Sequence, residues 1–130
     1  MNRENILAVA DAIEKHSIPD LGFNMGNYVT TAGSSVTDNS GYGCGTVACI
    51  AGWCKAVRDG KAPQPVWVDD FNWEKQASWL GLSVGEGERL FIYYPGHGND
   101  IQPSQAVSVL RHLAETGEVD WDRALAEPSK

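Results

Sequence analysis

Apolar residues recur at helical spacing in several separate stretches of the chain, and stretches rich in glycine, proline, serine and asparagine divide them. The first stretch predicts a helix over about residues 3–16, which ends before Pro19. Its apolar face is formed by Ile6, Leu7, Val9, Ala10 and Ile13. A second helix is predicted over about residues 45–58. Its helically spaced apolar residues are Val47, Ile50, Ala51, Cys54 and Val57.

Three more helices are predicted in the second half of the chain, and their ends carry capping or breaking residues. Their approximate ranges are 73–81, 84–93 and 104–116. Asn72 can cap the first of them. Ser83 followed by Glu86 is a capping-box pair at the start of the second. Pro103 opens the third, and Gly117 closes it.

Two long loops, residues 20–43 and 94–100, separate the helices and are rich in glycine and small polar residues. The first loop contains a short extended piece at Asn27–Thr31, and Val66–Val68 has the composition of a short strand. Asp120 can cap a last short helix. A loop as long as residues 20–43 in a small domain is typical of a functional or mobile segment.

These elements predict a mainly α protein: a single compact domain, residues 1–130, of five or six short helices with two long loops and at most a minor β element. A chain of 130 residues is long enough for one core and too short for two ordinary domains. The hydrophobic fraction of 42% is that of a folded protein rather than a disordered one.

The charge balance disfavours nucleic-acid binding. Acidic residues outnumber basic residues by 17 to 10, which gives a net charge of −7. A uniformly basic surface for nucleic acid is therefore absent, and no nucleic-acid partner is expected. The N-terminal residues lack the apolar run of a signal peptide, and no stretch has the length of a membrane span. We expect a cytoplasmic protein with reduced thiols and no membrane association.

All three cysteines lie within residues 41–54, and one of them has a physical case for reactivity. Cys44 stands at the start of the predicted second helix, where the helix dipole lowers the pKa of a thiol. A thiol enzyme also needs a base, and His97 lies in a glycine-rich loop beside Asn99 and Asp100. The candidate catalytic set is therefore Cys44, His97 and Asp100 (or Asn99), with Thr46 or Gln102 as oxyanion donors.

The alternative interpretation, which the sequence favours, is that the cysteines are structural. Free cysteine packs as a small hydrophobe, and Cys49 and Cys54 follow the helical pattern of core residues. The four-residue gaps between the cysteines do not match zinc-site spacing, because a step of five residues turns about 140° around a helix. No metal and no cofactor are expected.

Residues 73–93 have the pattern of a helix-turn-helix unit, which is the second alternative function. The matching residues are Ala77, Leu80, Gly81, Leu82 and Ser83. The second helix would present two glutamates and one arginine to DNA. Because few cations are available to meet phosphates, two packed helices without a DNA role are the favoured interpretation.

Aromatic residues near loops form a candidate binding patch. Trp67, Tyr93, Tyr94 and His97 lie at or near predicted loops and could line a pocket, although core packing is the more common fate of such rings.

Several short motifs run through most of the chain in a fixed order. They are Phe23–Met25, Cys44–Thr46 with Cys49–Trp53, Leu80–Leu82, Leu90–Phe91 and Thr116–Trp121. This pattern resembles a group of uncharacterised small proteins encoded by bacteriophages, prophages and some bacteria, which share a Cys-Gly-Thr-x-x-Cys-Ile-Ala-Gly-Trp segment. The resemblance implies a phage-type origin and supplies no activity.

The leading hypothesis is a small acidic accessory protein of the phage or prophage type. It would bind a host or phage macromolecule, with a protein as the expected partner, as a modulator or inhibitor. Its small size and the absence of a complete catalytic set favour a non-enzymatic role. The alternative is a cysteine-dependent hydrolase or transferase that uses Cys44 with His97.

Overall fold

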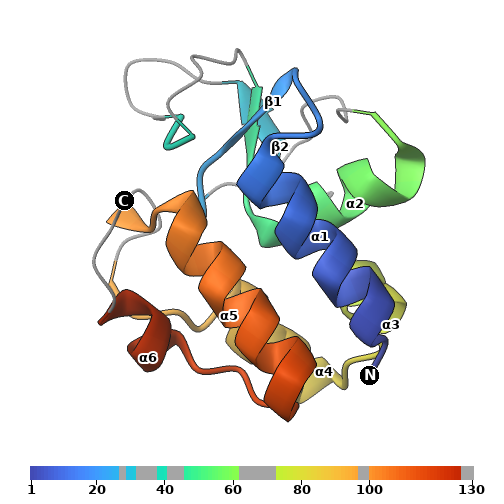
Figure 1. Ribbon diagram of the computed structural model, residues 1–130, viewed down its shortest axis with the longest axis vertical. Helices are drawn as coiled ribbons and strands as arrows, with labels where there is room; N and C mark the ends of the chain where they lie inside the picture. Colours follow the sequence, from blue (N-terminus) through green and yellow to red (C-terminus); the bar gives the residue numbers. More distant parts are fainter. Residues whose placement is uncertain (27–28, 32–37, 41–45, 62–72, 97–99, 127–130) are drawn as a thin grey trace.

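The structure, a computed structural model, describes residues 1–26, 29–31, 38–40, 46–61, 73–96 and 100–126 (Figure 1). Within these ranges the chain forms six helices and three strands. The elements in order are α1 (Arg3–Lys15), β1 (Leu21–Phe23), β2 (Val29–Thr31), β3 (Thr46–Ala48), α2 (Ile50–Asp59), α3 (Trp73–Trp79), α4 (Val84–Phe91), α5 (Pro103–Thr116) and α6 (Trp121–Leu125). The predicted fold class, mainly α with a minor β element, is confirmed.

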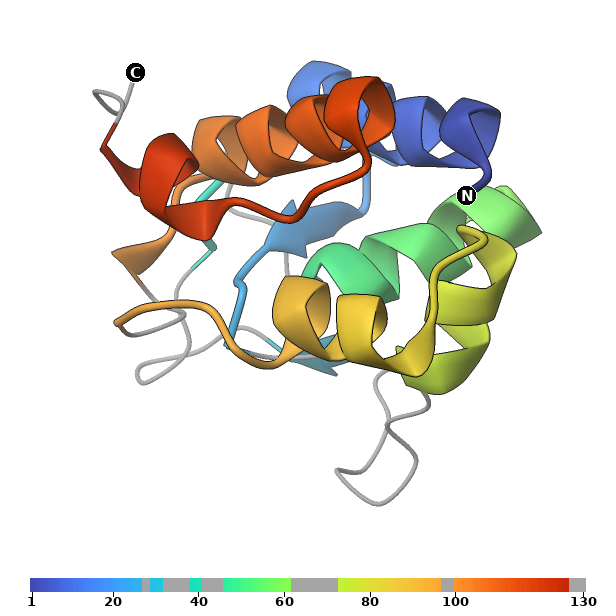
Figure 2. The ribbon, with the colours of Figure 1, turned by 90° about the horizontal axis from the view of Figure 1, so that it is seen from below.

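The helices form two layers. Figure 2 shows α1, α5 and α6 on one side of the molecule and α2, α3 and α4 on the other. The apolar faces of both layers meet in the core. Its largest fully buried side chains include Ile6, Val9, Ile50, Trp53, Leu80, Leu90, Leu110 and Leu113. The helices of each layer therefore bury one face in the core and expose the opposite face to solvent, as the helical spacing of apolar residues predicts.

A three-stranded sheet lies at one end of the layers, in the order β1-β3-β2. The pairing of β1 with β3 is parallel and places Gly22 opposite Val47, whereas β2 and β3 are antiparallel. The extended piece expected at Asn27–Thr31 is confirmed as β2 over Val29–Thr31. The strand β1 was not predicted, because three residues in a glycine-rich stretch show too little alternation to mark a strand.

The second helix begins later than predicted. The expected range was residues 45–58, but Thr46–Ala48 form β3 and the helix starts at Ile50. Cys49 has extended backbone angles (φ −78°, ψ −175°) and is the N-cap residue. Thr46 and Val47 are β-branched, and both pair with strands on either side. This pairing makes the segment a strand, although its apolar spacing also fits a helix.

The predicted helix signals are otherwise confirmed where the structure describes them. The Ser83 side chain accepts a hydrogen bond from the Glu86 backbone N–H, and the Glu86 side chain accepts one from the Ser83 N–H. Gly117 ends α5 in the left-handed conformation, and the Asp120 side chain caps α6. The predicted Asn72 cap and the predicted strand at Val66–Val68 lie outside the described residues.

No helix in the described ranges combines the length and the apolar character that crossing a membrane requires.

A close approach of α3 and α4 gives a first prediction. A β-carbon built on Gly87 would lie 2.7 Å from Ala77 Cβ and 3.1 Å from the Trp73 ring, whereas one built on Gly85 meets nothing within 4 Å. Gly87→Ala should therefore lower the free energy of unfolding by about 1–3 kcal/mol through overpacking. Gly85→Ala, on the same helix, should raise it by up to about 1 kcal/mol through helix propensity. Chemical denaturation of both variants tests the prediction, and equal effects would contradict it.

Candidate functional site

A groove of about 520 Å³ runs along α5. It is lined by the α5 side chains Ser104, Val107 and Ser108, with Ile13 and Glu14 of α1 on one side. Asn39, Ser40, Gln102 and Gln105 line it near the start of α5, and Arg111, His112, Glu115 and Arg123 line it farther along. Most of the lining residues therefore carry hydroxyl, amide or charged groups, and Ile13, Pro103 and Val107 contribute apolar surface.

The wall formed by residues 38–40 is fixed by a set of hydrogen bonds to β1. The Asp38 carboxylate accepts bonds from the Phe23 backbone N–H (3.1 Å), the Ser40 backbone N–H (2.9 Å) and the Ser40 hydroxyl (2.6 Å). The Asn39 backbone N–H donates to the Phe23 carbonyl at 2.7 Å. A β-carbon on Gly22 would collide with the Asp38 carboxylate, so the glycine is what lets this segment lie close to the strand.

The same wall is joined to the start of α5. The Asn39 side-chain amide donates to the Ile101 carbonyl at 3.1 Å. This bond brings residues 38–40, which precede the segment of Cys44, beside Asp100–Ile101, which follow the segment of His97. Asp100 is exposed in a short turn. Cys44 and His97 themselves lie outside the described residues, so the candidate catalytic set stays a prediction.

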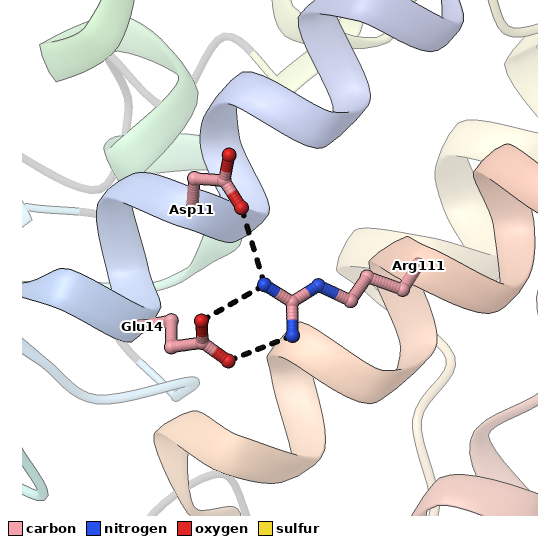
Figure 3. Close-up of polar contacts among 3 residues, drawn as sticks. All are labelled: Asp11, Glu14 and Arg111. Carbon is pink, nitrogen blue, oxygen red and sulfur yellow. Dashed lines mark hydrogen bonds and ion pairs between the residues drawn. The ribbon is translucent and has the colours of Figure 1, made fainter.

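An ion cluster spans α1 and α5 at the groove (Figure 3). Arg111 donates from Nη1 to Glu14 Oε2 at 2.7 Å and from Nη2 to Glu14 Oε1 at 2.9 Å, and Nη2 also reaches Asp11 Oδ1 at 3.1 Å. The hydrogen bonds from Arg111 lower the pKa of Glu14, and those to Glu14 raise the pKa of Arg111. One guanidinium faces two carboxylates, so the cluster carries a net negative charge.

The Arg111 cluster predicts a small stability effect that depends on pH. The pKa of Glu14 is lowered in the folded protein, so the interaction with Arg111 adds fully to the free energy of unfolding above the unfolded-state pKa of Glu14. This stabilisation is lost as pH falls through the folded-state pKa. Arg111→Met should cost at most about 1 kcal/mol at neutral pH, since all three side chains are about half exposed. The difference from wild type should shrink when Glu14 is protonated, and high salt should also reduce it.

Lys55→Met is the matched control for the Arg111 prediction, because it removes one exposed pair, Lys55–Asp59 at 3.4 Å, within a single helix. Its effect should be smaller than that of Arg111→Met. Urea denaturation at two pH values measures both, and an Arg111→Met effect that does not change with pH would contradict the assignment.

The two described cysteines are buried, as predicted. Cys49 is 2% exposed and Cys54 is fully buried, and both thiols are free. Burial raises the pKa of Cys49 to about 11, and the backbone N–H groups of Gly52 and Ala51 at the helix start offset this only in part. Burial also raises the pKa of Cys54 well above its usual value. Desolvation therefore outweighs the helix dipole at the one cysteine that caps α2.

This geometry corrects the argument made for Cys44. The predicted helix start at residue 45 is wrong, because β3 and Cys49 precede the first residue of α2. Cys44 is therefore five residues from the N-cap position, and the helix dipole gives no reason for a lowered pKa of its thiol.

Thiol labelling provides a direct prediction. In the folded protein near neutral pH, Cys49 and Cys54 should not react with iodoacetamide, because both are buried and their thiols stay protonated. Folded Cys44→Ser protein should therefore gain no label, and the unfolded variant should gain two. Mass spectrometry counts the labels, and a label on the folded variant would overturn this prediction.

The aromatic candidates fall into different environments. Tyr93 is 67% exposed and lines a hollow of about 160 Å³ with Arg89 and Trp121. Tyr94 is half-buried, its hydroxyl donates to the Met25 carbonyl at 3.3 Å, and its ring meets that of Trp121 edge-on at 6.0 Å. Tyr94 therefore packs the chain together, whereas Tyr93 is available to a partner. The other two candidates, Trp67 and His97, lie outside the described residues.

The helix-turn-helix segment forms two packed helices. α3 and α4 are joined by residues 80–83, and the Trp73 ring meets the Phe91 ring edge-on at 6.4 Å. The Glu86 carboxylate is used in the capping box. The remaining charges on the helix are Glu88 and Arg89. A helix with this charge balance gives DNA phosphates little attraction.

Sequence reasoning missed the α5 groove. Ser104, Ser108, Arg111 and Glu115 recur three or four residues apart, but this is also the pattern of any solvated helix face. The contributions of Asn39 and Arg123 come from distant parts of the chain, and only the fold brings them to α5.

Within the described ranges, no group of three His, Cys, Asp or Glu side chains is placed to hold a metal ion. Comparison with known proteins finds no matching family model, no similar curated protein and no similar solved structure.

Proposed function

We propose that this protein is a small accessory protein of the phage or prophage type that modulates or inhibits a partner protein by binding one of its segments in the groove along α5. The observation that carries the proposal is the groove itself: about 520 Å³, lined from four separate parts of the chain. A shallow site with this lining suits a partner that offers backbone N–H and C=O groups.

The lining chemistry supports a polypeptide over other ligands. The Asn39 and Ser40 side chains already hydrogen-bond to Ile101 and Asp38, whereas Gln102, Ser104 and Ser108 supply an amide and two hydroxyl groups to the groove. These groups can bond the main chain of an extended peptide, while the Arg111 cluster and Arg123 offer charges for its side chains. The net charge of −7 disfavours nucleic acid.

Affinity capture with matched variants tests the proposal. The bait proteins are wild type, Ser108→Arg, which fills the groove with a long side chain, and Ser78→Arg, which adds the same charge to an exposed site on α3 in the other layer. We expect one stoichiometric protein from bacterial lysate with wild type and Ser78→Arg. Ser108→Arg should lose it. No stoichiometric partner, or equal capture by Ser108→Arg, would contradict the proposal.

A second candidate function, a cysteine-dependent hydrolase or transferase, is favoured by one observation. The Asn39–Ile101 hydrogen bond joins the described residues that flank the segments of Cys44 and His97, directly beside the groove. The test measures the rate of alkylation of Cys44 against pH. An apparent pKa well below that of an ordinary thiol, lost in His97→Ala, supports an activated pair. An ordinary thiol profile removes the basis for this function.

A further inference from the structure

The exposed large apolar side chains of the described residues gather around α4. They are Met1 (55% exposed), Val84 (57%), Ile92 (37%) and Tyr93 (67%). Val84 begins α4, and Ile92 and Tyr93 directly follow it. Figure 2 shows α4 in the layer opposite α5, so this surface is separate from the groove. Single exposed apolar residues need no explanation, but several at the two ends of one short helix indicate a contact surface.

The exposed side of α4 has an ordered arrangement of residues. With about 100° per residue, Gly85 and Ile92 fall within about 20° of each other at the centre of the exposed arc. Glu88 and Arg89 lie about 50° to either side of that centre. A β-carbon on Gly85 would meet nothing within 4 Å, so a neighbouring helix could approach here.

The two flanking charges are available to a partner. Within the described residues, the ion pairs are Lys55–Asp59, Arg111–Asp11 and Arg111–Glu14, and neither Glu88 nor Arg89 takes part in them. The Glu86 carboxylate is already held by Ser83. The surface therefore carries one free carboxylate and one free guanidinium on opposite sides of an apolar and glycine centre.

From this arrangement we infer that two copies of this chain pair symmetrically through α4, with the two helices side by side and parallel. In a parallel two-fold pair, the left side of one helix faces the right side of the other, so Glu88 of each copy meets Arg89 of its partner. In an antiparallel pair, Glu88 would face Glu88 and Arg89 would face Arg89. Charge complementarity thus selects a second copy as the occupant and fixes the direction of the helices.

The first experiment measures the association of the full chain. Sedimentation velocity over a range of concentrations should show a reversible monomer–dimer equilibrium, weak because the apolar surface is small. A protein that stays monomeric up to about 1 mM overturns the inference. Salt should weaken the dimer, because its specificity comes from exposed ion pairs.

Charge reversal identifies the surface and tests the pairing of Glu88 with Arg89. Glu88→Arg places like charges opposite each other at two symmetric positions and should weaken dimerisation about tenfold or more. The double variant Glu88→Arg with Arg89→Glu should restore it. Glu118→Arg makes the same charge change at an exposed site outside α4 and should leave the dimer unchanged. A dimer insensitive to Glu88→Arg excludes this surface, and failure of the double variant to restore it excludes the parallel arrangement.

Cysteine cross-linking gives an independent readout that does not depend on affinity. In a Cys44→Ser background, Ile92→Cys should form a disulfide with Ile92→Cys of its partner under mild oxidation, since parallel pairing brings equal positions together. Glu115→Cys, an exposed position on α5 in the opposite layer, is the control and should stay monomeric. Absence of cross-linking at position 92 in a sample that dimerises overturns the proposed geometry.

Discussion

Replacement of Trp53 by alanine should lower the free energy of unfolding by about 3–5 kcal/mol, the range for removal of a buried tryptophan. Trp53 is 1% exposed on α2, and its indole N–H donates to the Gly22 carbonyl at 2.9 Å. Its ring also lies 6.2 Å from that of His16, the residue that ends α1. One side chain thus joins α2, β1 and the end of α1, so its loss leaves a cavity and removes the hydrogen bond to the Gly22 carbonyl.

Two further variants separate the parts of the Trp53 effect. Trp53→Phe keeps an aromatic ring and loses the hydrogen bond, and should cost about 1–3 kcal/mol. It also keeps the test measurable if Trp53→Ala does not fold, since whole domains have only about 5–15 kcal/mol of stability. Trp79→Ala removes a half-buried tryptophan that lies under Arg58 at 6.0 Å, and should cost less than Trp53→Ala. Urea denaturation measures all three, and equal losses for Trp53→Ala and Trp79→Ala would contradict the anchoring role.

The Trp53 anchor also shows why part of the fold could be predicted and part could not. Helices α1, α4 and α5 follow from local signals: apolar spacing, the Ser83–Glu86 capping box and Gly117. The sheet depends on contacts between residues far apart, such as Gly22 with Val47 and Trp53 with Gly22. No local pattern encodes those pairs, so the apolar spacing around Thr46–Ala48 predicts a helix where the fold forms a strand.

The candidate site shows the same division more sharply. The predicted burial of Cys49 and Cys54 is confirmed, although only Cys54 lies on the helix and Cys49 is its N-cap residue. The groove along α5 did not follow, because its wall depends on Asp38 and Asn39, which hydrogen-bond to Phe23 and Ile101 across gaps of 15 and 62 residues. The residue types indicate which side chains could take part in chemistry. Only the tertiary hydrogen bonds place the polar residues 38–40 beside α5.

Replacement of Gly81 by alanine should be the second severe change, with a loss of about 2–5 kcal/mol from two separate costs. Gly81 has a φ of +73°, a left-handed conformation that costs a residue with a β-carbon about 1–2 kcal/mol. A β-carbon there would also lie 2.5 Å from the Asn2 backbone nitrogen and 2.9 Å from the Met1 Cα. Because the Asn2 N–H donates to the Leu80 carbonyl at 2.7 Å, the start of the chain cannot move away without losing that bond. The second cost is therefore one of overpacking, about 1–3 kcal/mol.

Gly117→Ala is the control that isolates the two costs at Gly81. Gly117 has a nearly equal φ of +81°, ends α5, and has nothing within 4 Å of its would-be β-carbon. It should show the conformational cost alone, so the difference between the two variants measures the contact with the N-terminal backbone. Thermal and urea unfolding of both variants gives that difference. If Gly81→Ala costs no more than Gly117→Ala, the start of the chain does not pack against the α3–α4 turn. A larger loss at Gly81 shows that this turn, which the sequence marks only as a helix end, is also the site where the first residues of the chain are held.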